Sequence, residues 1–115
     1  MAIVSNAGGF AVVSSDAVAD QPELSMASFT RETLDHLASE LPSEANIYNP
    51  VDVLGDARLE RYRLSIEAML ADENVDAIVV IMAPVGTAAV ANIAQYIADL
   101  GDRLTKPLVT CLMGG

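Results

Sequence analysis

The sequence predicts a single α/β domain built on a parallel, doubly wound sheet, and three observations lead to this class. The chain has 115 residues, which is enough for one domain. Short apolar runs alternate with helical patterns along its length, as in sheets whose parallel strands are connected by helices. Hydrophobic residues make up 52% of the chain but aromatic residues only 4%, so the core must be mainly aliphatic.

The first third of the chain predicts a buried strand over Ala2–Ser5, a helix over residues 9–19 and a short second strand over residues 24–27. Thr30 is a suitable N-cap for a second helix, which should continue to Glu40 because a proline follows shortly after. The apolar side of this helix is expected at helical spacing, on Leu34, Leu37, Ala38 and Leu41.

The middle of the chain predicts a loop over residues 46–56 and a third helix over residues 59–71. The loop carries the string Asn-Pro-Val-Asp-Val-Leu-Gly-Asp-Ala, which begins at Asn49. The inward side of the third helix is expected on Tyr62, Ile66, Met69 and Leu70.

The last third predicts a continuous apolar strand over residues 77–82, a helix over residues 87–100 capped by Thr87, and a final strand over residues 106–113. The single cysteine, Cys111, excludes an internal disulfide and is expected to be a small core residue of the last strand. The chain closes on two glycines where a further helix would start, so we expect the sheet to be truncated at the C-terminus, within a longer polypeptide.

The charge of the chain limits its partners. Sixteen acidic and six basic residues give a formal net charge of −10, which argues against binding to nucleic acid or to an anionic membrane. No signal peptide or membrane-spanning run is present, so we expect a cytoplasmic location. Fifteen of the charged residues lie in residues 30–76, and the two nearly neutral helices outside this range are expected to be covered by a partner surface.

Two glycine-bearing turns are the candidate functional site. In each of them a predicted strand meets glycine and then a helix, and the unpaired N–H groups of a helix start attract phosphate or carboxylate. The alternative is that these glycines only permit tight turns. The candidate phosphate- and acyl-binding residues are Asn6, Gly8, Gly9, Val85, Gly86 and Thr87.

Other chemistry-bearing residues form no recognisable catalytic set. The lone histidine, His36, is expected to be a solvated surface residue on a charged helix. Asp52 and Asp56 could form a carboxylate pair, although roles in turns and caps are favoured. No metal-ligand cluster and no nucleophile with a base in reach stand out, so we assign no catalytic or metal-binding residue.

Several strings resemble the NDP-forming acyl-CoA synthetases, which include ADP-forming acetate–CoA ligases and relatives of succinyl-CoA synthetase. The strings are residues 3–9, Asp16-Ala17, residues 49–57, Arg61-Tyr62 and residues 113–115, and the resemblance covers essentially the whole chain. The similar region is a three-layer, flavodoxin-like (Rossmann-like) domain, which makes residues 1–115 a single succinyl-CoA-ligase-like domain.

The resemblance implies a part in a ligase reaction, in which acyl-CoA, phosphate and NDP interconvert with acid, CoA and NTP. The domain would help to bind acyl phosphate through Asn6 and would direct the helix start at Pro84, Val85, Gly86 and Thr87 toward a phosphohistidine. That histidine belongs to a partner domain in the family, so His36 does not inherit its role.

The resemblance also implies which cofactors and partners the parent enzyme has. The parent enzyme would use CoA, ATP or ADP, and Mg²⁺. Its CoA-binding domain, its phosphohistidine-bearing domain and its ATP-grasp module would hold them, and this domain itself would bind no cofactor. The isolated chain is expected to be inactive. Two alternatives stay open: a ligand-sensing domain of a protein lysine acetyltransferase, and a free-standing flavodoxin-like binding module.

Overall fold

The computed structural model describes residues 1–6, 8–21, 25–54, 59–82 and 89–112. Four parallel strands form one sheet with the order β2-β1-β3-β4. The strands are β1 (Ala2–Ser5), β2 (Val51–Asp52), β3 (Ile78–Met82) and β4 (Leu108–Leu112). The α/β class, the parallel sheet and the alternation with helices are therefore confirmed.

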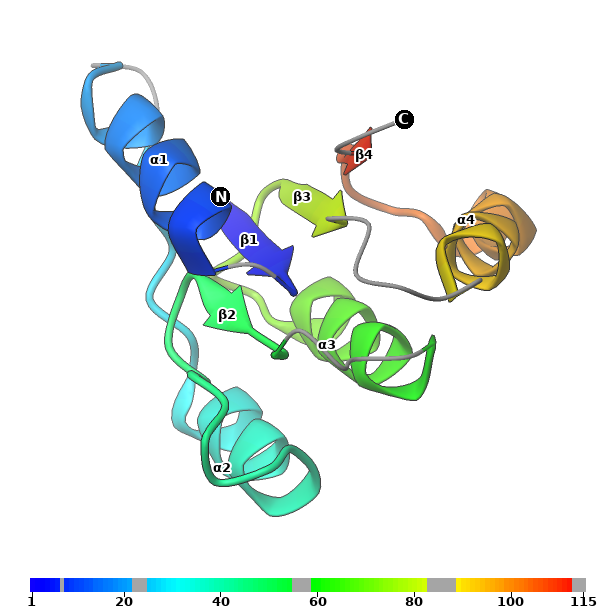
Figure 1. The fold of residues 1–115 in the computed structure, drawn as a ribbon, viewed down its shortest axis with the longest axis horizontal. Coiled ribbons are helices and arrows are strands. Elements are labelled where there is room, and N and C mark those ends of the chain that lie inside the picture. Colours follow the sequence, from blue (N-terminus) through cyan, green and yellow to red (C-terminus); the bar gives the residue numbers. More distant parts are fainter. Residues whose placement is uncertain (7, 22–24, 55–58, 83–88, 113–115) are drawn as a thin grey trace.

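Helices lie on both faces of the sheet, so the domain has three layers (Figure 1). The helix α1 (Gly8–Ala19) covers β1 on one face, whereas α3 (Leu59–Ala71) and α4 (Ala89–Leu100) cover the other. The helix α2 (Arg31–Glu40) packs against α3, and a short 3₁₀ helix, η1 (Gly101–Arg103), follows α4.

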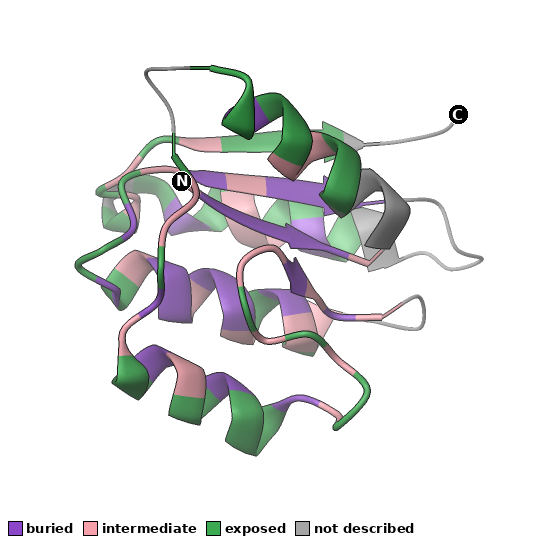
Figure 2. Cartoon of the chain, turned by 90° about the vertical axis from the view of Figure 1, so that its left-hand side faces the viewer, coloured by how far each residue is buried: buried purple, intermediate pink, exposed green. Residues whose placement is uncertain are grey.

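The main core lies between the sheet and α3, as the buried side of α3 in Figure 2 shows. Alternate strand residues such as Val4 and Val80 point into it, because successive side chains of a strand face opposite sides. Buried positions on α3 include Tyr62, Ile66 and Met69, as predicted, whereas Leu70 is only half-buried.

Three predictions about the elements are wrong. Residues 25–27 form no strand, and the second strand is Val51–Asp52, inside the predicted loop. On the apolar side predicted for α2, Leu37 and Leu41 are buried as expected, whereas Ala38 is exposed and Thr33 is buried in addition. Cys111 is exposed because β4 borders only β3 in the described sheet, and α1 covers β1 rather than β4.

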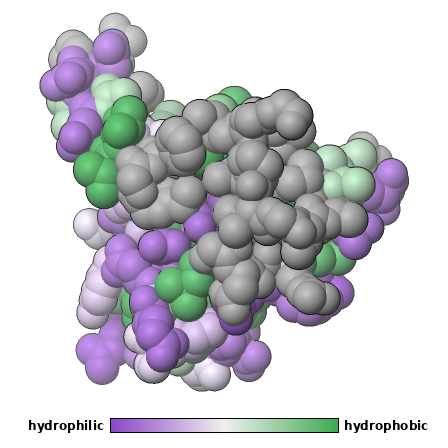
Figure 3. All heavy atoms as spheres, in the orientation of Figure 1, coloured by the Kyte–Doolittle hydropathy of each residue, from purple (hydrophilic) through white to green (hydrophobic). Residues whose placement is uncertain are grey.

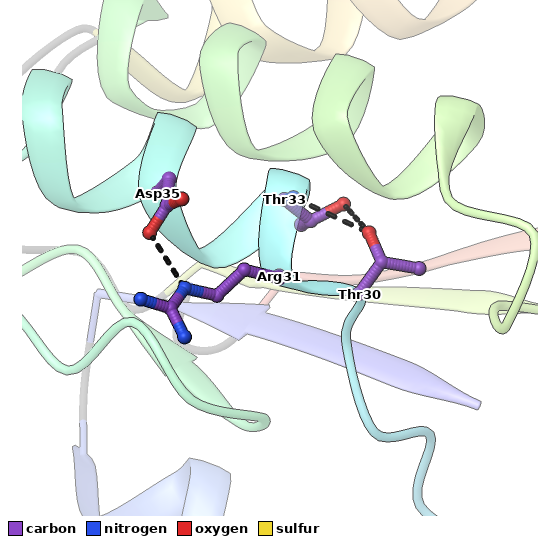
Figure 4. Close-up of polar contacts among 4 residues, drawn as sticks. All are labelled: Thr30, Arg31, Thr33 and Asp35. Atoms are coloured by element: carbon purple, nitrogen blue, oxygen red, sulfur yellow. Dashed lines mark hydrogen bonds and ion pairs between the residues drawn. The ribbon is translucent and has the colours of Figure 1, made fainter.

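The predicted cap of α2 is present. The Thr30 hydroxyl oxygen accepts the Thr33 N–H at 3.3 Å and donates to the Thr33 hydroxyl oxygen at 3.1 Å (Figure 4). The Arg31–Asp35 ion pair beside it, 3.3 Å between Nε and Oδ1, is highly exposed and contributes little to stability.

Asp72 connects the start of α2 to the end of α3. Its carboxylate oxygens accept the N–H groups of Thr30 at 2.9 Å and of Asn74 at 2.8 Å. The Lys106 Nζ donates to the backbone carbonyl oxygens of Asp72, at 2.6 Å, and of Met69, at 3.0 Å. An ammonium group at this place stabilises the negative end of α3.

The side-chain amide of Asn49 lies along the first half of β1, where β2 does not reach. Its Oδ1 accepts the Ile3 N–H at 2.9 Å. Its Nδ2 donates to the carbonyl oxygens of Met1, at 2.8 Å, and of Ala27, at 3.0 Å. One side chain therefore satisfies three backbone groups, and this explains the first residue of the Asn-Pro-Val-Asp string.

We expect Asn49→Ala to lower the free energy of unfolding by about 3 kcal/mol, since it leaves a buried N–H and two carbonyl oxygens without this partner. Urea unfolding followed by circular dichroism measures the change. The control is Asn46→Ala in the same loop, where the side chain is exposed and the loss should stay below about 1 kcal/mol. Equal unfolding midpoints for the two variants would contradict the role of Asn49.

The carboxylate of Asp72 should make stability depend on pH. Burial alone would raise the pKa of Asp72, but hydrogen bonds from Thr30, Asn74 and Thr33 and the charge of Lys106 outweigh it and hold this pKa below its usual value of 3.8. The unfolded chain then binds the proton more readily, so the contribution of Asp72 is complete well above pH 3.8 and is lost as the pH falls through the lower folded pKa.

We therefore expect the free energy of unfolding to decrease less steeply below about pH 4 in Asp72→Asn than in the unmodified chain. Urea titrations at a series of pH values measure the slopes. Asp35→Asn removes the same charge from an exposed position and should keep the original slope. A profile for Asp72→Asn parallel to that of Asp35→Asn would refute the assignment.

Candidate functional site

The carboxyl ends of the strands meet at one edge of the sheet, and this edge contains a topological switch point. The chain leaves β1 and returns on one side of it as β2, whereas β3 lies on its other side. Ligands of open parallel sheets bind at such a point. The candidate ligand edge therefore lies beyond the ends of β1 and β3, which are Ser5 and Met82.

The first predicted anion turn lies at this edge. Ser5 ends β1, Asn6 follows as a half-buried residue, and α1 begins at Gly8. Gly8 and Gly9 form the start of α1, and no acidic residue stands in its first turn. The first turn of α1 therefore adds no negative charge of its own, although Asp52, the register partner of Ser5, brings a carboxylate to the same edge.

The second predicted anion turn lies outside the described residues. The positions concerned are Val85, Gly86 and Thr87, together with Pro84 before them. The described end of β3, Met82, is buried and lies at the same edge as Asn6. The strands that precede the two predicted turns, β1 and β3, are therefore neighbours in the sheet, while the contacts of the second turn remain a prediction.

A buried tyrosine joins the ends of β1 and β3. Tyr62, in the first turns of α3, has no exposed surface, and its hydroxyl donates to the Ile81 carbonyl oxygen at 2.9 Å. The same hydroxyl accepts the backbone N–H of Asn6. Burial raises the pKa of Tyr62 well above its usual value. The hydrogen bond from Asn6 lowers this pKa and the negative charge of Asp52 raises it further, but both effects are smaller than that of burial. The hydroxyl therefore stays protonated.

The turn after β2 is held by the Asp52 side chain and by Arg61 of α3. The Asp52 Oδ1 accepts the Leu54 N–H at 2.9 Å, and Leu54 has a positive φ of 76°. The Val53 carbonyl oxygen accepts the Arg61 Nη1 donor at 2.9 Å. Asp52 therefore has the turn role favoured from the sequence, whereas Asp56 lies outside the described residues.

Comparisons with known proteins agree with this fold and show its family. The chain is 39% identical over 115 residues to an ADP-forming acetate–CoA ligase (ligase I) of Archaeoglobus fulgidus, and the match covers 100% of this chain and 16% of that protein. The chain belongs to the ADP-forming acyl-CoA synthetases. No family model matches the sequence.

Solved structures support this family assignment and the fold. A crystal structure of a Pyrococcus horikoshii protein matches with a TM-score of 0.85 and 30% identity, covering 100% of this chain and 27% of that one. A dinucleotide-forming acetyl-coenzyme A synthetase from Candidatus Korarchaeum cryptofilum, in complex with phosphate and ADP, matches with a TM-score of 0.75 and 28% identity, covering 99% and 25%. The chain spans about a sixth of the curated relative and about a quarter of the solved chains.

A groove in the described part of this synthetase domain lies away from the switch point. Its volume is about 540 Å³, and it lies between α2 and α3. It is near the end of α3, and this end is far from the carboxyl edge because α3 starts at that edge and runs away from it. His36 lines it as an exposed residue, as the sequence predicts. The lining residues are Thr30, Glu32, Thr33, His36, Ala68, Ala71, Asp72 and Glu73.

Among the described residues, no group of three or more histidine, cysteine or acidic side chains could hold a metal ion. Likewise, none of the helices within the described ranges is sufficiently long and apolar to cross a bilayer.

Sequence reasoning missed the role of the Tyr62 hydroxyl. The helical spacing predicts that Tyr62 faces inward, but it gives no partner for the polar end of the side chain. The available signal was chemical: a tyrosine at a core position needs a hydrogen-bond partner for its hydroxyl.

Proposed function

We propose that this chain is one domain of an ADP-forming acid–CoA ligase, in which acyl-CoA, phosphate and ADP interconvert with acid, CoA and ATP. The observation that carries the proposal is the 39% identity with the Archaeoglobus fulgidus ligase along the whole chain. The fold match to a synthetase in complex with phosphate and ADP agrees with it. The cytoplasmic location expected from the sequence remains a prediction.

The role of the domain in this reaction is electrostatic. The side chain of Asn6 and the N–H groups at Gly8 and Gly9 contact the acyl phosphate, and the turn at residues 85–87 supplies N–H groups to a phosphohistidine of a partner domain. Donors fixed in place before the reaction stabilise a transferring phosphoryl group without further reorganisation. The position of Asn6 at the switch point and the absence of acidic residues in the first turn of α1 support this role.

The remaining machinery lies in the other domains of the parent enzyme. CoA, ATP or ADP, and Mg²⁺ are bound by the CoA-binding domain, the phosphohistidine-bearing domain and the ATP-grasp module, and this domain alone catalyses no reaction. Its exposed apolar side chains on α1, Val12 and Val13, agree with a covered surface, and Figure 3 shows hydrophobic spheres over α1.

The test is a chimera in which residues 1–115 replace the matching segment of the Archaeoglobus fulgidus ligase. We expect this protein to form acetyl-CoA from acetate, CoA and ATP. Asn6→Ala in the chimera should lower kcat/KM at least tenfold, equivalent to about 1.4 kcal/mol, because a side-chain donor to the acyl phosphate is lost.

Asn46→Ala is the matched control, since it removes an exposed asparagine side chain from the loop that precedes β2. Its kcat/KM should stay within twofold of the unmodified chimera. A folded chimera without turnover would overturn the proposed function. Equal activities for Asn6→Ala and Asn46→Ala would move the acyl phosphate contact to other residues.

A further inference from the structure

We propose that the groove between α2 and α3 is a docking site for a segment of the parent enzyme outside residues 1–115, and that this segment inserts an arginine side chain into it. The inference goes beyond the proposed function, because no residue of the two predicted anion turns lines the groove. It gives a partner to the part of the chain that carries most of its charge, residues 30–76.

The groove has an apolar floor, because small residues face it from both helices. Ala68 and Ala71 are three residues apart and therefore lie on one side of α3. Ala68 is 8% exposed, and Thr33 on α2 is 7% exposed. The space left between these short side chains is about 540 Å³, which lies within the range of roughly 300–1,000 Å³ that ligand pockets have.

The walls of the groove are acidic. Glu32 on α2 and Glu73 just after α3 line it as exposed residues. Within the described ranges, neither carboxylate has a hydrogen-bond or ion-pair partner. None of the residues that line the groove is lysine or arginine. A cation placed here therefore meets two carboxylates that its own domain leaves unpaired.

Other charged groups close to the groove are engaged within the domain. The Asp72 carboxylate also lines it, but this carboxylate accepts two backbone N–H groups, at 2.9 and 2.8 Å. The Lys106 ammonium group donates to two carbonyl oxygens at the end of α3. Arg31 forms an ion pair with the aspartate one turn later. Glu32 and Glu73 are thus the charges that remain for a partner.

An arginine side chain matches both the floor and the walls. Its aliphatic stem covers apolar surface while the guanidinium group stays at the polar rim. The five N–H donors of this group suffice for two carboxylates, and its plane stacks on flat rings such as the imidazole of His36, which also lines the groove. The chain itself has six basic and sixteen acidic residues and spans 16% of the Archaeoglobus fulgidus ligase, so we place the arginine in the rest of the parent enzyme.

The first test is a titration of the chain with butylguanidinium, followed by heteronuclear NMR of isotope-labelled protein. This probe carries the charged group and an alkyl stem. The backbone signals of Thr33, Ala68 and Ala71 should shift and saturate. Guanidinium without a stem should bind more weakly, because it cannot cover the apolar floor.

Two variants and a matched control show whether the carboxylates hold the probe. Glu32→Gln and Glu73→Gln should each raise the dissociation constant about threefold, since each removes one of two partners of the cation. Asp35→Asn removes the same charge from α2 at a position that does not line the groove, so its dissociation constant should equal that of the unmodified chain.

The second test asks for the docked segment in the full-length chimera. In hydrogen exchange followed by mass spectrometry, peptides from residues 30–40 and 66–74 should exchange more slowly in the chimera than in the isolated chain, because the segment covers the groove. Glu73→Lys should abolish this protection by placing a like charge against the arginine, whereas Asp35→Lys should keep it.

Each outcome supports or overturns the inference. A folded chain that does not bind butylguanidinium, or binds it equally in Glu73→Gln and Asp35→Asn, would overturn the groove as a cation site. Binding to the chain without protection in the chimera would assign the groove to a free organic cation and overturn the docking.

If the isolated chain does not fold, the comparison of Glu73→Lys with Asp35→Lys in the chimera decides by itself, and equal exchange in the two variants would refute the docking. No readout here needs ligase activity. An inactive chimera in which Glu73→Lys alone speeds exchange at the groove would overturn the proposed function and leave this inference in place.

Discussion

The fold depends on keeping β1 in place, because this strand of four residues lies between β2 and β3 and every one of its side chains is buried. Backbone polar groups in such a place need partners. Two side chains supply those that the short sheet does not: Asn49 along the first half of β1, and Tyr62 just after its carboxyl end. The central strand is thus anchored at both ends by residues that come much later in the chain.

The same principle applies to the helices on the main core side. Asp72 accepts hydrogen bonds at the start of α2 and just after α3, and Lys106 connects the end of α3 to the segment that precedes β4. Apart from the local bond to Asn74, these contacts join residues that are 34 to 42 positions apart in the chain. Few charges do this structural work in a strongly acidic chain, whereas exposed pairs such as Arg31–Asp35 contribute little.

The sequence predicts most elements because their signals are local. The third helix, Leu59–Ala71, and the Thr30 cap agree with their predictions residue by residue, since helical spacing and capping are set by neighbouring residues. The two-residue strand β2 could not be found in this way, because it is defined by pairing with Val4 and Ser5 rather than by its own pattern. Similarly, the sequence predicts that Asn6 reaches the ligand edge, but the partner of the Tyr62 hydroxyl depends on how α3 packs.

The contacts of Asn49 have a consequence for how such sequences are interpreted. Asn49 and Asp52, two polar residues of the string that resembles the family most, bind backbone groups of their own domain. A search with this string would therefore retrieve proteins that share a scaffold, whatever acid they activate. Differences in substrate preference between relatives should be sought in the residues that line the edge beyond β1 and β3, and not in the string by which they are recognised.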